Sequence, residues 1–249
     1  MRRLLCSLMC FVLAFSFGGC SRSTTSGGGD EVATNEVATN EVVTNGVTTI
    51  DDNAYYADYN EVYDLIKAYN SGLSMCAKIN LTIIQQTFDF YSGNNAGASK
   101  IWGMANQMIL LSKAVDDQAS YESYLTRNGV TSTSNKNQVS NLLRYIYYDD
   151  NYYNKSLDPL FATFKACNIV RKALPDRATE IKTAIEDLRS KYGTKYSMEI
   201  ELLDDWFSEC RSYSTEMERT SGESLYSFTS KMNQFETELN KLASKADRH

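Results

Sequence analysis

Apolar residues recur every three or four positions through most of the chain after residue 52, which is the spacing of one face of an α-helix. The clearest stripe lies near the C-terminus: Leu225, Phe228, Met232, Phe235, Leu239 and Leu242. Thr220 and Glu223 fit a capping box in front of it. The spacing predicts a helix of about 25 residues here.

Similar stripes and capping residues divide the rest of this region. The expected helices are 53–90, 99–127 ended by Asn128 and Gly129, one capped by Asn135 and Gln138, one begun by Asp158 and Pro159, one from Pro175 to Gly193, and one through Leu203 and Met217. No segment alternates as a strand does. We therefore predict an all-α fold, a bundle of six or seven mostly antiparallel helices.

The first twenty residues have the pattern of an export signal. Arg2 and Arg3 precede an apolar run from Leu4 to Phe17, which is too short to span a membrane. Gly18, Gly19 and Cys20 then resemble a bacterial lipobox. The resemblance implies that residues 1–19 are a lipoprotein signal peptide, cleaved before Cys20, and that the Cys20 thiol is diacylated. The alternative is an ordinary secretory signal with an incidental cysteine.

A polar repeat follows the cysteine. Residues 31–50 read EVATN, EVATN, EVVTN and GVTTI, behind a stretch with three consecutive glycines. Such a segment buries too little apolar surface to offset its ordering entropy. We expect residues 20–52 to be a lipidated cysteine and a disordered tether with a span of roughly 30 Å, and residues 53–249 to be the helical domain. The alternative is that the repeat is itself a ligand for a partner.

The residue inventory argues against several functions. The only histidine is His249, the last residue, so triads and zinc sites that need a positioned imidazole are not expected. Phosphate-binding glycine motifs are missing from the sequence. We expect neither an enzyme nor a cofactor nor a metal site. The formal net charge of −6 argues against nucleic acid as a partner.

Three cysteines lie within the predicted domain: Cys76, Cys167 and Cys210. Each falls on the apolar face of an expected helix, which favours burial as small hydrophobic side chains. One disulfide with one free thiol, and a three-cysteine metal site, remain as alternatives.

Tyrosine is abundant, with 17 residues, several of which gather in two clusters. The first cluster comprises Tyr55, Tyr56, Tyr59 and Tyr63. The two tryptophans, Trp102 and Trp206, are instead expected in the core. Adjacent tyrosines on a helix point about 100° apart, so one face cannot bury them all. Exposed tyrosine suits protein recognition, although half-buried structural roles remain open. The second cluster gives the predicted binding set: Tyr145, Tyr147, Tyr148, Asp149, Asp150, Tyr152 and Tyr153.

The whole layout, a lipobox-like cysteine, a polar tether and a helical domain, resembles the helical outer-surface lipoproteins of spirochaetes, notably of Borrelia-type bacteria. The resemblance implies a protein anchored by lipid to the outer membrane at the cell surface. It also implies binding of host proteins, such as complement components or regulators and matrix or plasma proteins, in adhesion or immune evasion. The alternative is a periplasm-facing lipoprotein with a structural or transporter-associated role.

Overall fold

The computed structural model describes residues 51–93, 96–148, 156–219 and 224–247. The chain divides into two units, Met1–Asp51 and Asp52–His249. The predicted signal peptide, Cys20 and all but the end of the tether lie outside the described residues. The second unit is helical, and its described part contains no strand. Its helices are α2 (Asp52–Tyr91), α3 (Ala98–Ala114), α4 (Gln118–Arg127), α5 (Thr133–Tyr148), α6 (Asp158–Glu216) and α7 (Leu225–Ala246). The predicted all-α bundle is confirmed.

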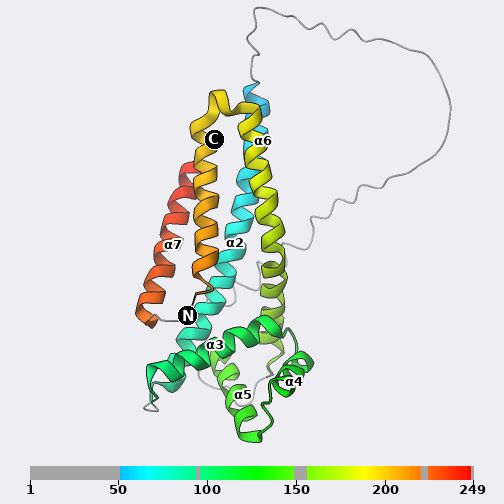
Figure 1. The fold of residues 1–249 in the computed structure, drawn as a ribbon, viewed down its shortest axis with the longest axis vertical. Helices are drawn as coiled ribbons and strands as arrows, with labels where there is room; N and C mark the ends of the chain where they lie inside the picture. Colours follow the sequence, from blue (N-terminus) through cyan, green and yellow to red (C-terminus); the bar gives the residue numbers. More distant parts are fainter. Residues whose placement is uncertain (1–50, 94–95, 149–155, 220–223, 248–249) are drawn as a thin grey trace, which may run out of the picture. The chain divides into compact units, whose positions relative to one another are not determined.

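The longest element, α6, is a helical hairpin with two arms (Figure 1). Tyr196 has non-helical backbone angles, φ −120° and ψ 30°, and the chain reverses direction there. Arg189 and Asp204 form an ion pair of 2.6 Å across the two arms. We call residues 158–195 the first arm and residues 197–216 the second arm.

The first arm of α6 lies antiparallel to α2. Near the start of α2, Asp58 pairs with Lys191 at 3.2 Å, and further along α2, Cys76 contacts Cys167. Residue numbers therefore rise in α2 as they fall in the first arm. The apolar stripe of α2 is buried as predicted, with Ile66 and Leu73 at 0% exposure.

The second arm and α7 complete a four-helix arrangement with α2 and the first arm. Glu216 accepts a bond of 3.0 Å from Lys231, and the Tyr213 hydroxyl donates one of 3.4 Å to Glu236, so α7 runs antiparallel to the second arm. The Tyr59 hydroxyl donates to the backbone oxygen of Ala246, which joins α7 to α2. Most neighbouring elements are thus antiparallel, as expected.

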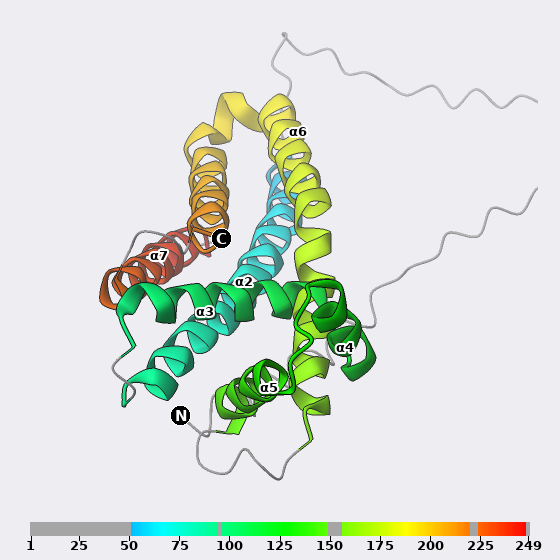
Figure 2. The same cartoon turned by 60° about the horizontal axis from the view of Figure 1, so that its bottom comes forward.

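Three shorter helices lie at the end of this bundle where α2 finishes (Figure 2). The single helix expected over 99–127 is wrong, because α3 and α4 are separate. The break falls at Asp117, whose carboxylate accepts a bond of 2.8 Å from the backbone N–H of Ser120 and caps α4. The predicted end of this segment is confirmed, since Gly129 adopts a φ of 71° just after α4.

Other helix boundaries in the structure differ from the predicted ones. Pro175 does not start a helix but lies inside α6, on its exposed side. The chain reverses at Tyr196, three residues beyond the predicted end at Gly193. The cap of α7 is Ser224, whose hydroxyl accepts from Ser227, whereas the predicted capping box, residues 220–223, lies outside the described residues.

The helix expected to be capped by Asn135 is present as α5, but it starts earlier than predicted. The helix begins at Thr133, and the hydroxyl of Ser132 accepts a bond from the Asn135 N–H. The two tryptophans also differ from each other. Trp206 has 0% exposure and lies in the core as predicted, while Trp102 is only half-buried.

Candidate interaction surface and buried polar cluster

The described part of the predicted binding set forms the C-terminal end of α5. Tyr145 packs edge to face against Phe90 at the end of α2, with ring centroids 5.3 Å apart. Tyr147 and Tyr148 contact each other at 4.2 Å with perpendicular rings, and Tyr148 donates to the backbone oxygen of Ser156. All three tyrosines are half-buried. Asp149, Asp150, Tyr152 and Tyr153 lie outside the described residues.

Two residues that the sequence analysis did not include extend this group. Phe90 and Tyr91, the last residues of α2, contact each other at 5.0 Å and are also half-buried. We call Phe90, Tyr91, Tyr145, Tyr147 and Tyr148 the distal aromatic group. It lies at the opposite end of α2 from Asp52, and a 40-residue helix is about 60 Å long.

The first tyrosine cluster has a structural role instead. Tyr55, Tyr59 and Tyr63 are buried, with exposures of 0%, 1% and 8%. Tyr55 stacks on Tyr196 with ring centroids 3.6 Å apart and planes within 3°. The kink residue of α6 is therefore held by a ring from the first turn of α2, and this cluster closes the end of the bundle near Asp52.

Burial raises the pKa of Tyr59 to about 12 from its ordinary value of 10.0. Between these values the unfolded chain releases a proton that the folded chain keeps, so stability falls as the pH rises from 10 to 12. We expect Tyr59→Phe to lower the free energy of unfolding by about 1 kcal/mol at neutral pH, because the hydrogen bond from the Tyr59 hydroxyl to Ala246 is removed. We also expect a shallower loss of stability in alkaline solution.

Urea unfolding at several pH values from 8 to 12 measures both effects. Tyr226→Phe serves as the control, because this tyrosine is 85% exposed. Curves of stability against pH that stay parallel for Tyr59→Phe and the native chain would contradict the assignment of the alkaline titration to Tyr59.

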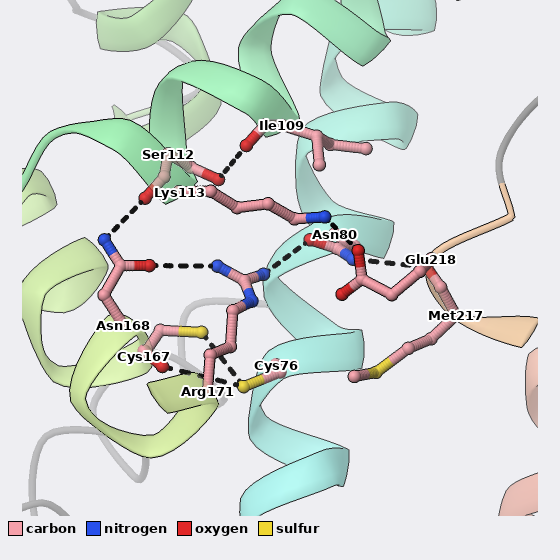
Figure 3. Close-up of polar contacts among 10 residues, drawn as sticks. All are labelled: Cys76, Asn80, Ile109, Ser112, Lys113, Cys167, Asn168, Arg171, Met217 and Glu218. Atoms are coloured by element: carbon pink, nitrogen blue, oxygen red, sulfur yellow. Dashed lines mark hydrogen bonds and ion pairs between the residues drawn. The ribbon is translucent and has the colours of Figure 1, made fainter. Parts of the chain in front are cut away.

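A polar cluster lies between α2, α3, the first arm of α6 and the residues that follow the second arm (Figure 3). Its centre is the Arg171 guanidinium, which donates bonds of 2.8 Å to Asn80 and 3.2 Å to Asn168. Asn80 in turn donates to the backbone oxygen of Met217, and Asn168 donates to that of Ser112. Asn80 and Asn168 are buried, at 1% and 8% exposure.

The cluster joins four segments that are distant in the sequence. Lys113 of α3 forms an ion pair with Glu218, which follows the second arm. A buried amide or guanidinium without partners costs free energy, so these bonds favour one relative placement of the segments. The arrangement offers hydrogen bonds that specify packing.

Sequence reasoning missed this cluster, although a signal was present. Asn80 occupies the same face of α2 as Cys76 and Ile83, where an apolar residue is expected. Asn168 and Arg171 are three residues apart and so share one face of the first arm. Polar residues at such positions indicate a buried hydrogen-bond network, but the periodicity does not say which segments meet there.

The three cysteines are buried as predicted, at 1% exposure or less. Cys210 lies in the second arm, and burial raises the pKa of its thiol. Cys76 and Cys167 lie together, with their Sγ atoms 3.2 Å apart. The contact with Cys167, together with burial, raises the pKa of the Cys76 thiol. Among the described residues no group of three potential ligands is placed to hold a metal ion.

The fold thus defines an all-α bundle with an aromatic group at one end and a buried polar cluster. Within the described ranges, none of the helices has the length and apolar content needed to cross a bilayer. Comparison with protein-family models, with curated proteins and with solved structures finds no significant match to this chain.

Proposed function

We propose that the chain is a lipid-anchored protein of the bacterial outer membrane that binds a host protein at the cell surface. The classes of host protein are those implied by the resemblance to spirochaetal surface lipoproteins: complement components or regulators, and matrix or plasma proteins. Cys20 carries the lipid and residues 21–52 form the tether. No enzymatic step, cofactor or nucleic acid belongs to this proposal.

The observation that supports binding is the position of the distal aromatic group. The tether joins the helical unit at the start of α2, whereas Tyr147 and Tyr148 gather near the other end of that helix, about 60 Å away. Tyrosine provides large contact area at low entropic cost, and its hydroxyl is satisfied in water or across an interface. The distal aromatic group therefore lies at the end of α2 that is farthest from the point where the tether is attached.

We expect the triple variant Tyr147→Ala, Tyr148→Ala, Tyr152→Ala to bind its host protein at least about tenfold more weakly, because aromatic anchors dominate most interfaces. The full chain is used to capture proteins from host serum, and the dissociation constant of the captured protein is then measured. Circular dichroism and thermal unfolding check that the variant keeps its helices.

Tyr226→Ala is the control, since this tyrosine is exposed and lies on α7, away from the distal aromatic group. Equal affinity of the triple variant and the native chain would remove the distal aromatic group as the binding site. A serum capture that yields no saturable ligand would count against host-protein binding as a whole.

Orientation at the membrane is tested separately by treating intact cells with protease. A surface protein is digested, whereas a periplasm-facing lipoprotein survives until the outer membrane is opened. Survival in intact cells would favour the structural or transporter-associated alternative.

A further inference from the structure

Two buried thiols connect α2 to the first arm of α6. The Sγ atoms of Cys76 and Cys167 lie 3.2 Å apart, closer than non-bonded sulfur atoms normally approach, and they point toward each other (Figure 3). Their exposures are 0% and 1%. The sulfurs of a disulfide are about 2.05 Å apart, so the two atoms need to approach by only about 1 Å.

The backbones also come close at this point. One turn before Cys76, a methyl group on Gly72 would lie 2.8 Å from Cγ1 of Val170, which is one turn after Cys167. A glycine is therefore what lets α2 approach the first arm here. Close backbone approach is one geometric requirement for a disulfide, because the two Cα atoms must lie within about 7 Å of each other.

We propose that Cys76 and Cys167 are a disulfide cross-linking site. The oxidant is a second disulfide, either of a small thiol or of a dithiol oxidase. One cysteine thiolate attacks that disulfide and releases one thiolate, and the other cysteine then attacks the mixed disulfide and releases the second. Two electrons pass from the cysteine pair to the donor disulfide, and two protons accompany them.

The exchange takes place while the chain folds, because both thiols are buried afterwards. A compartment that supplies such oxidants follows from the proposed export of the chain, but the pairing itself depends only on the fold. Cys210 is equally buried but lies in the second arm, so it keeps its thiol.

The cross-link would close a loop between residues 91 positions apart. Closing so long a loop restricts the unfolded chain, and it is expected to raise the thermal midpoint by about 5–15 °C. It would also fix the contact between α2 and the first arm next to the polar cluster, since Arg171 follows Cys167 by one helical turn.

The test is refolding of the full chain in a mixture of reduced and oxidised glutathione. Free thiols are then blocked with N-ethylmaleimide, and the protein is digested without reduction for mass spectrometry. We expect a linked Cys76–Cys167 peptide and a blocked Cys210. A chain that regains its helices with Cys76 and Cys167 both blocked would overturn the proposal, as would predominant linkage to another cysteine.

Two variants separate the cross-link from packing effects, because each is compared with itself before and after reduction. Cys210→Ala should keep both the linked peptide and the rise in midpoint, while Cys76→Ala should lose both. An equal rise in Cys76→Ala would also overturn the proposal. This test uses no cells. Its result on the cross-link is therefore independent of whether the protein is located at the cell surface.

Discussion

Replacing Trp206 with alanine is expected to lower the free energy of unfolding by about 3–5 kcal/mol, the range for truncating a large buried aromatic side chain. Trp206 has 0% exposure, and its ring packs against Tyr63 with centroids 5.3 Å apart. Two contributions make up this loss. The buried ring no longer gains the free energy of leaving water, and the surrounding helices cannot fill the cavity that it leaves. Urea unfolding followed by circular dichroism measures it.

Trp102→Ala is the matched control, because Trp102 is half-buried where α3 contacts Phe88 of α2. The same substitution should cost clearly less there. Equal losses at the two tryptophans would contradict the placement of the core between α2 and the second arm.

Introducing valine at Gly72 is expected to cost about 2–3 kcal/mol through overpacking. The Cβ of the new residue would lie 2.8 Å from Val170, whose branched side chain has few rotamers with which to withdraw. The two helices must then separate, which weakens the contact along their length. Thermal and urea unfolding report the loss.

Gly103→Val supplies the control, since a Cβ on Gly103 meets nothing within 4 Å. The helix propensities of valine and glycine differ by less than about 0.5 kcal/mol at an exposed position, so we expect little change in stability. Combining Gly72→Val with Val170→Ala should restore part of the stability. No recovery in the double variant would show that the close approach of these helices is not the cause.

The helical class followed from the sequence because the apolar stripes are long and regular. Trp206 and Leu239 are buried at positions that the 3.6-residue period marks as apolar. The break before α4 was missed because the apolar pattern continues across it. The sequence did contain a sign of this break, because Asp117 is a residue type that caps helices and it lies three positions before Ser120. The regular apolar spacing on both sides made the segment look like one helix.

The site was less predictable than the fold. The position of Tyr147 and Tyr148 at a helix end was evident, but the contact of their neighbour Tyr145 with Phe90 depends on how α5 packs against α2. The pairing of Asn80 with Arg171 likewise joins positions 91 residues apart. Periodicity gives the face of each helix but not the partner of that face, so such contacts appear only in three dimensions.

The proposed lipid anchor of this helical bundle can be detected by mass spectrometry of the N-terminal peptide, from protein extracted from bacterial membranes. We expect a mature chain that begins at Cys20 and carries a diacylglyceryl group on its sulfur. A peptide that runs through an unmodified Cys20, or a mature chain that begins at a different residue, would contradict it.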